Sequence, residues 1–259
     1  MSKVAIITGV RRIGFYAAQF LLSQGFDLAV LYRSSEERAR ELKTYGEGLG
    51  RRVLTFEVDL TDPSTYRGIP DEVFDRLGRI DLLVNAASPF GKLSWEETDA
   101  EDLRFYFSAV VESAFLLSKG AARYMLKNSG PVKGRIVNFG DWATAKGSPY
   151  RGFVPYLVAK GALDALTRVL AVELAPEVLV NEIALGPVLP PFLEGREKGE
   201  GWDRYVKRKT LLGRPVGLED VLAALDFLLK TKTLTGEILL LDAGQRFVGG
   251  GYAAGEQFQ

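Results

Sequence analysis

The chain has 259 residues, 47% of them apolar and 25% charged, and its 33 basic and 33 acidic side chains give a formal net charge of zero. This length and apolar content suit one α/β domain with a sizeable core, and the mixed charges provide no basic face for nucleic acid, which leaves small molecules as the expected partners. The absence of cysteine and histidine excludes disulfide frameworks, thiolate chemistry, serine–histidine triads and ordinary zinc sites, and we expect no bound metal.

The chain opens with MSKVAIITG, an apolar run too short for a signal peptide or a membrane span, so we expect a cytoplasmic protein that makes no membrane contact. Short apolar runs rich in β-branched residues recur after it, as is typical of strands buried on both faces of a sheet. The seven expected strands cover residues 4–8, 28–32, 53–58, 80–85, 135–139, 179–184 and 238–241.

Longer segments with helical spacing lie between these strands. Examples are residues 17–24, 36–49, 100–126, 157–174 and 218–229. The alternation predicts a single α/β domain over residues 1–259, with a Rossmann-type, doubly wound, seven-stranded parallel sheet flanked by helices.

The least regular stretch covers residues 186–213 and holds Pro187, Pro190 and Pro191 together with several glycines. It follows the sixth expected strand, at the edge of the sheet where such folds bind their ligands. This favours a substrate lid over residues 186–213, and a mobile surface loop is the alternative.

The first strand runs into TGVRRIG, residues 8–14, and then into a helix. Gly9 and Gly14 let the backbone turn tightly and approach a pyrophosphate, and the helix N-terminus supplies unpaired N–H groups. Because such turns also occur without a nucleotide, the motif alone leaves a phosphate ligand and a plain turn about equally open.

The second strand ends at Arg33 and Ser34, where an NAD-specific site would carry an aspartate or glutamate. An arginine beside a hydroxyl suits a 2′-phosphate, and Arg11 lies within reach of the same group, which favours NADP(H) over NAD(H). In the alternative interpretation Arg33 is solvated, and Ser34 forms a capping box with Glu37. Asp59, after the third strand, is expected to bind the adenine amino group or to serve as a turn residue.

The fifth strand delivers Asp141, and Tyr156 and Lys160 lie one helical turn apart on one face of the next helix. A phenol has an unperturbed pKa of about 10, so a nearby ammonium is expected to lower the pKa of Tyr156. Tyr156 would donate a proton to a substrate atom that has received hydride, while Lys160 would hold the nicotinamide ribose. The same spacing recurs at Tyr205 and Lys209, which follow no strand and are interpreted as a solvated helix pair.

These motifs occur in the order typical of the short-chain dehydrogenase/reductase family, which the chain resembles over nearly its whole length. The matching pieces are TGVRRIG, the VDL around Asp59, LVNAAS at 83–88, YLVAK at 156–160 and the terminal LTGEILLLDAG. The resemblance implies a homotetramer or homodimer and a bound NADP(H). The implied cofactor-binding residues are Gly9, Arg11, Arg12, Ile13, Gly14, Tyr32, Arg33, Ser34, Asp59, Leu60, Asn85, Ala86, Ala87, Tyr156, Lys160, Pro187 and Val188.

Within that family the chain is most similar to pteridine reductases and the related dihydromonapterin or dihydrofolate reductases. Asp141 stands where most family members have a serine, as it does in those reductases, and YLVAKGALDALTRVLAVELAP at 156–176 is very similar to their sequence. The resemblance implies that Arg12 and Ser88 contact the substrate and that Phe90 stacks on a pterin ring. Ordinary packing is the alternative for Phe90.

The resemblance implies that NADPH delivers hydride to a C=N or C=O bond, in the first place of a dihydropterin, with Asp141, Tyr156 and Lys160 as catalytic residues. For Asp141 to donate a proton at neutral pH, burial must raise its pKa. The alternatives are a 3-oxoacyl or other carbonyl reductase, and a non-catalytic NADP(H)-binding sensor. An enoyl-thioester reductase is disfavoured because Phe153 stands where that subgroup has a tyrosine.

Three features depart from the family pattern. The glycine loop is one residue shorter between Gly9 and Gly14, and Ala86 replaces the second asparagine of the usual NNAG-like run. Val110, with Glu112 nearby, replaces a helix asparagine that supports a proton-relay water in the family. These departures keep the sensor open as an alternative.

Overall fold

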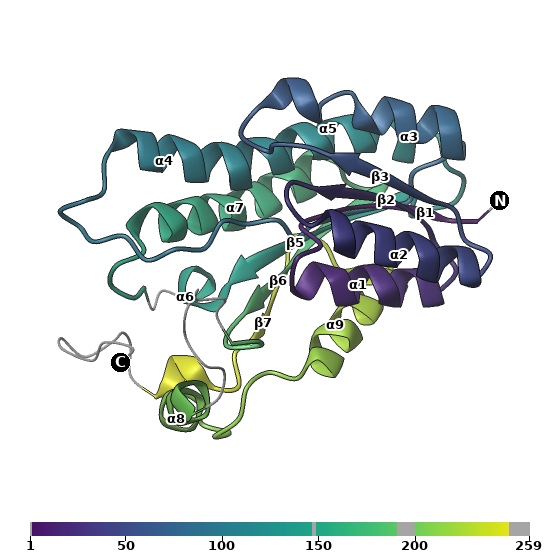
Figure 1. Ribbon diagram of the computed structural model, residues 1–259. Coiled ribbons are helices and arrows are strands. Elements are labelled where there is room, and N and C mark those ends of the chain that lie inside the picture. The colour runs from purple at the N-terminus through teal and green to yellow at the C-terminus, as the bar shows by residue number, and fades with distance from the viewer. Residues whose placement is uncertain (1, 147–148, 191–199, 249–259) are drawn as a thin grey trace.

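The computed structural model of the chain describes residues 2–146, 149–190 and 200–248. Seven parallel strands form one sheet in the order β3-β2-β1-β4-β5-β6-β7 (Figure 1). The strands are β1 (Val4–Thr8), β2 (Asp27–Tyr32), β3 (Val53–Glu57), β4 (Leu82–Asn85), β5 (Gly134–Asp141), β6 (Val178–Leu185) and β7 (Ile238–Leu241). The predicted doubly wound α/β fold is confirmed, and the strand order reverses between β1 and β4, where such sheets bind ligands.

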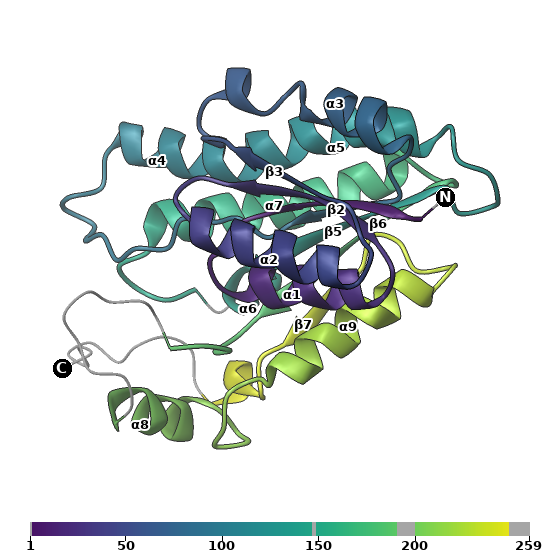
Figure 2. The same cartoon turned by 45° about the vertical axis from the view of Figure 1, so that its right-hand side comes forward.

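Helices cover both faces of the sheet (Figures 1 and 2). The face above the sheet in Figure 1 carries α3 (Ile69–Leu77), α4 (Ala100–Phe107), α5 (Ser113–Met125) and α7 (Val154–Glu173). The opposite face carries α1 (Ile13–Ser23), α2 (Glu36–Gly48) and α9 (Leu218–Lys230). Across the described ranges, no helix is both long and apolar enough to cross a membrane.

Two apolar clusters correspond to these two helical layers. Along β1, Ala5 and Ile7 belong to the cluster under α1 and α9, whereas Val4 and Ile6 belong to the cluster under α3 and α5. Successive side chains of a strand point to opposite faces of a sheet, so a strand covered on both sides is apolar throughout. This is why the short continuous apolar runs of the sequence predicted the strands.

The long helix expected over residues 100–126 is interrupted in its middle. Its first part, α4, ends at Phe107, and a π-helical turn, η2 (Ser108–Glu112), separates it from α5. The Oγ of Ser113 donates a hydrogen bond to the carbonyl of Ala109 at 2.8 Å. A serine that binds the carbonyl four residues earlier competes with the helical N–H and bends the helix.

Other helices differ from the sequence-based expectation at their ends. The predicted helix over residues 157–174 begins three residues earlier, at Val154, because Pro155 lies in its first turn, where no backbone N–H is needed. Short or weakly apolar helices were not singled out by periodicity. They are α3, α6 (Trp142–Ala145) and α8 (Glu200–Lys209), with the 3-10 turns η1 (Pro63–Thr65) and η3 (Gln245–Phe247).

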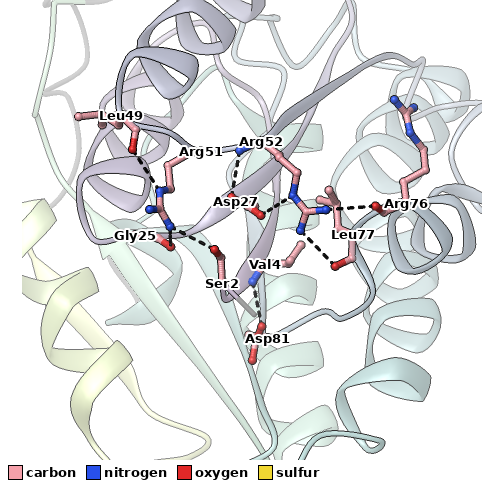
Figure 3. Close-up of polar contacts among 10 residues, drawn as sticks. All are labelled: Ser2, Val4, Gly25, Asp27, Leu49, Arg51, Arg52, Arg76, Leu77 and Asp81. Atoms are coloured by element: carbon pink, nitrogen blue, oxygen red, sulfur yellow. Dashed lines mark hydrogen bonds and ion pairs between the residues drawn. The ribbon is translucent and has the colours of Figure 1, made fainter.

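The amino ends of the strands are tied together by polar contacts (Figure 3). The buried carboxylate of Asp27 accepts hydrogen bonds from the backbone N of Arg52 at 3.0 Å and from its Nε at 2.8 Å. Arg52 also donates to the carbonyl of Leu77 at the end of α3, and Asp81 accepts from the backbone N of Val4 at 2.8 Å. These contacts tie the start of β2 through the start of β3 to α3, and the start of β1 to that of β4, at the end of the sheet opposite to the site described below.

Candidate active site

A cavity of about 1530 Å³ opens at the carboxyl ends of the strands. It exceeds the roughly 300–1,000 Å³ that hold one small ligand, so it has room for a dinucleotide and a second molecule. The predicted site residues that line it are Gly9, Arg11, Arg12, Ile13, Gly14, Tyr32, Arg33, Ser34, Asp59, Leu60, Ala86, Ala87, Ser88, Phe90, Asp141, Tyr156, Lys160, Pro187 and Val188.

Asn85 differs from the other predicted site residues because it is not part of the cavity lining. It is buried at the end of β4, and its Nδ2 donates a hydrogen bond to the Oδ1 of Asn138 in β5 at 2.9 Å. Its side chain therefore joins two strands below the cavity floor.

The turn after β1 requires glycine at both of its predicted positions. Gly9 has a φ of 76°, and a Cβ on it would lie 2.4 Å from the Cα of Ala87. A Cβ on Gly14 would lie 2.4 Å from the carbonyl oxygen of Gly9. The N-terminus of α1 follows directly, and Arg12 at its N-cap makes no side-chain capping bond. The first backbone N–H groups of α1 and the positive end of its dipole suit an anion at the cavity wall.

The turns after β2 and β3 hold the residues predicted to bind the adenosine end. Arg33 and Ser34 are exposed after β2. The capping-box alternative for Ser34 is wrong, because Ser35 is the N-cap residue of α2 and makes no side-chain capping bond. Asp59 is a turn residue, since its Oδ1 accepts from the N and Oγ1 of Thr61 at 2.9 and 2.7 Å. These bonds lower the pKa of Asp59.

Asp141 accepts hydrogen bonds from several groups at the centre of the cavity. It ends β5 and is the N-cap residue of α6, where its Oδ1 accepts from the backbone N of Ala143 at 2.9 Å. Its Oδ2 accepts from the hydroxyl of Tyr156 at 2.8 Å and from the hydroxyl of Tyr150 at 3.1 Å. The predicted Asp141 and Tyr156 thus meet directly, and Tyr150 is a third member that sequence analysis missed.

Lys160 lies on the same face of α7 as Tyr156. It is buried, and its Nζ donates to the backbone carbonyl of Phe139 in β5 at 2.6 Å. The Nζ lies 5.9 Å from the centre of the Tyr156 ring. The helical spacing therefore brings the two side chains together as predicted, with the ammonium directed toward the end of β5.

Burial dominates the titration of this group. It raises the pKa of Asp141, although the bonds from Ala143 and Tyr156 oppose the rise. It also raises the pKa of Tyr156 well above its ordinary value, together with the charge of Asp141, and it lowers the pKa of Lys160. The expectation that the pKa of Tyr156 is lowered is wrong in direction, because desolvation and the charge of Asp141 raise it and the charge that opposes them is that of Arg12.

An aromatic surface adjoins Tyr156. The ring of Phe90 is stacked on Phe153, with centres 4.9 Å apart and planes at 23°, and meets Tyr156 edge-on at 5.0 Å. Phe90 is nevertheless 50% exposed, so part of its ring faces the cavity. It combines the two interpretations, because it packs on Phe153 and also presents an open aromatic surface.

The segment predicted as a lid contributes to the cavity at both described ends, while residues 191–199 lie outside the described part of the chain. Nη2 of Arg12 donates to the carbonyls of Leu189 and Pro190, at 2.9 Å each. Tyr205 and Lys209 of α8 line the cavity, and the hydroxyl of Tyr205 accepts from Gln245 at 2.9 Å. Both residues are half-buried, so they differ from the fully solvated pair expected from the sequence.

Val110, the replacement for the family's helix asparagine, lies in the π-helical turn. It is buried and packs in an apolar cluster with Tyr156 and Ala159. Its side chain offers no hydrogen-bonding atom. Any polar support of Lys160 must therefore come from groups other than this side chain.

Known proteins resemble this chain over nearly its whole length. A family model described as Enoyl-(Acyl carrier protein) reductase matches residues 9–246. The L-2,3-butanediol dehydrogenase of Corynebacterium glutamicum is 32% identical over 95% of this chain and 100% of its own length. The 3-oxoacyl-[acyl-carrier-protein] reductase of Homo sapiens is 30% identical over 96% of this chain and 100% of its own length.

A solved structure adds a likeness in three dimensions. The FolM alternative dihydrofolate reductase 1 from Brucella canis, complexed with NADP, has a TM-score of 0.83 and 29% identity, covering 95% of this chain and 94% of its own. The likeness in sequence and the likeness in structure both extend over about 95% of this chain. The names of these relatives refer to different substrates. The chain belongs to the short-chain dehydrogenase/reductase family and is an oxidoreductase of that family.

Proposed function

We propose that this chain is an NADPH-dependent reductase that acts on a C=N bond of a dihydropterin. The observation that carries the proposal is the carboxyl group of Asp141, held 2.8 Å from the hydroxyl of Tyr156 beside the half-exposed ring of Phe90. A pterin offers a flat ring for stacking and several nitrogen atoms for a carboxyl partner. The likeness to an NADP-bound dihydrofolate reductase supports the same substrate class.

The residues around the cavity fit NADP(H). The turn from Gly9 to Gly14 and the N-terminus of α1 would hold the pyrophosphate. Arg33, with Ser34 and Arg11, would hold the 2′-phosphate, since all three line the cavity and β2 ends without an acidic residue. When bound, the nicotinamide supplies the hydride.

The proton comes from the protein. In reduction of a C=N bond, hydride adds to the carbon and a proton adds to the nitrogen. Tyr156 is the proton donor, because its hydroxyl lies in the cavity beside Asp141 and the half-exposed ring of Phe90. Asp141 orients that hydroxyl and would pair with the ring, and Lys160, which lines the cavity, would bind the nicotinamide ribose. Arg12 and Ser88, which also line the cavity, contact the substrate.

A carbonyl reductase is the second candidate function. The relatives named L-2,3-butanediol dehydrogenase and 3-oxoacyl reductase support a C=O bond as the hydride acceptor. A ketone has one oxygen to protonate, which Tyr156 alone can serve. A ketone therefore offers no second group that the carboxyl of Asp141 could bind. For this reason we place this function second.

The two functions and a non-catalytic sensor are separated by one assay. NADPH oxidation is followed by its absorbance with dihydropterins, dihydrofolate, 3-oxoacyl thioesters and acetoin, using the wild type and Asp141→Asn. We expect turnover of the pterins, lost by at least about a hundredfold in the variant. Preferred turnover of ketones, unchanged in Asp141→Asn, would support the carbonyl reductase. NADPH binding without any turnover would support the sensor.

A further inference from the structure

Two buried acids lie in the core near Lys160, and the proposed chemistry does not use them. Glu182 in β6 is 0% exposed, and Asp164 in α7 is 4% exposed. Isolated buried carboxylates are strongly unfavourable unless they are paired or protonated. Their presence in the core beside a buried lysine therefore requires a physical explanation.

The two acids act on each other, since the side chain of each shifts the pKa of the other. Two carboxyl groups can hydrogen-bond to each other only if one of them carries a proton. The Oε2 of Glu182 also bonds to the Oγ1 of Thr167 at 2.8 Å. The Oε1 of Glu182 and the Oδ1 of Asp164 are buried and have no hydrogen-bond partner among the described residues. One proton between the two acids satisfies this arrangement.

The backbone of β5 makes room for this contact. A Cβ on Gly140 would lie 1.7 Å from the Oε1 of Glu182. Gly140 lies between Phe139, whose carbonyl binds Lys160, and Asp141. The side chain of Glu182 therefore crosses β5 at the point where the lysine and the central carboxyl group are held.

Lys160 is the buried cation beside the two acids, because Asp164 follows it by one turn of α7 and its Nζ bonds to the carbonyl of Phe139, the residue before Gly140. The charges that act on it are those of Glu182 from β6, Asp141 from β5 and Asp164 from α7, with Glu182 the strongest. Arg168 acts on Asp164 from the next turn of α7. Burial lowers the pKa of Lys160 and the charge of Glu182 opposes this, while burial raises the pKa of both acids.

We propose that Asp164 and Glu182 are a positioning pair that shares one proton and one negative charge, and that this charge keeps Lys160 protonated at the end of β5. The inference rests on the proposed function, because it assigns a task to the lysine of the same site. Either acid can carry the charge. Loss of one acid leaves the charge on the other, and only loss of both removes it.

The pH dependence of kcat tests this compensation. In Glu182→Gln and in Asp164→Asn, we expect the alkaline limb of the profile to stay near its wild-type position. In the double variant it moves to lower pH by about one unit, because a single charge acts strongly at a buried site. The double-variant shift thus exceeds the sum of the two single shifts. Additive shifts, or a loss of stability without any shift, would overturn the proposal.

Infrared spectroscopy tests the shared proton without turnover. At neutral pH the wild type should show the carbonyl stretch of a protonated carboxyl that is missing in each single variant, because the remaining acid is ionised. Signals from Asp141 are common to all these proteins and cancel in difference spectra. As a matched control, Glu177→Gln, which removes a half-exposed acid paired with Lys133 just before β6, should leave the stretch unchanged.

The two readouts separate the failure of the inference from that of the function. If no substrate is turned over but the infrared stretch follows this pattern, the proposed function is wrong and the proton-sharing pair stands. If turnover occurs but the stretch is absent from the wild type, or survives in both single variants, the pair is refuted. Because this comparison uses single neutral substitutions of similar shape, it remains decisive even if the double variant fails to fold.

Discussion

At the scale of single residues, the site depends on the hydrogen bonds that the carboxyl group of Asp141 accepts. Asp141 accepts hydrogen bonds from the backbone of Ala143 and from the hydroxyls of Tyr156 and Tyr150. The first two follow from the positions of Asp141 and Tyr156 in the sequence. Tyr150 was missed because it lies between α6 and α7, where no periodicity indicates the direction of a side chain.

Removing the Tyr150 hydroxyl tests its part in this arrangement. In Tyr150→Phe we expect kcat to fall by up to about tenfold, because one hydrogen bond of about 1 kcal/mol no longer orients the carboxyl group. The matched control is Tyr106→Phe, since Tyr106 packs in the same cluster as Tyr156 but is not among the described residues that donate hydrogen bonds to Asp141. Equal losses in the two variants would contradict the specific role of Tyr150.

Coenzyme preference is also decided by individual side chains. Arg33→Asp places a carboxylate where the 2′-phosphate is proposed to bind, so the preference for NADPH over NADH should fall by about a hundredfold. The ratio of kcat/KM for the two coenzymes measures this. The control is Lys43→Asp, which makes the same change of charge at an exposed residue of α2 that does not line the cavity. A ratio that responds equally to both substitutions would refute the contact.

At the scale of elements, the seven strands and the main helices were predictable because buried strands are apolar throughout and surface helices are periodic. The π-helical turn at Ser108–Glu112 was not, since it depends on how Ser113 competes for one carbonyl. The acid pair was not predictable either. A lone glutamate within an apolar strand does not indicate which side chain of α7 lies opposite it.

The crossing of Glu182 over β5 predicts a local packing effect. In Gly140→Ala the new methyl group collides with the Glu182 carboxyl, so the free energy of unfolding should fall by about 1–3 kcal/mol. Denaturant unfolding measures this change, and adding Glu182→Ala should recover part of it. Gly48→Ala in α2 is the control, because nothing lies within 4 Å of the added methyl group. Equal stability of Gly140→Ala and wild type would contradict this packing.

At the scale of the whole molecule, stability and pH are linked through the buried acids. Burial raises the pKa of Asp141 above its ordinary value of 3.8, so the folded protein keeps a proton that the unfolded chain has lost. This contribution to stability is fully present below the ordinary pKa. It is lost as the pH rises through the folded-state pKa.

Asp141→Asn removes this titration while keeping a similar shape. Above about pH 4, the stability of the variant relative to wild type should therefore rise by up to about 1.4 kcal/mol per pH unit, until the folded-state pKa is passed. Chemical unfolding of both proteins from acidic to neutral pH measures the difference. A difference that is constant with pH would contradict a raised pKa of Asp141.

The assembly of whole molecules is a property that the sequence indicates only through family resemblance. The implied homotetramer or homodimer stays a prediction, because an apolar side chain on a helix surface does not by itself identify the surface that covers it. The fold, by contrast, follows from the chain's own pattern of strands and helices. The shape of the cavity follows in turn from where those strands end.

The proposed reaction is hydride transfer from NADPH to a dihydropterin, with Tyr156 as proton donor. We would test it first with NADPH deuterated at the hydride position and mass analysis of the reduced pterin. We expect one deuterium in the product. In Tyr156→Phe, formation of this product should fall by at least about a hundredfold while NADPH affinity stays nearly unchanged. A product without deuterium would show that NADPH is not the hydride donor, and a variant as active as the wild type would show that Tyr156 is not the proton donor.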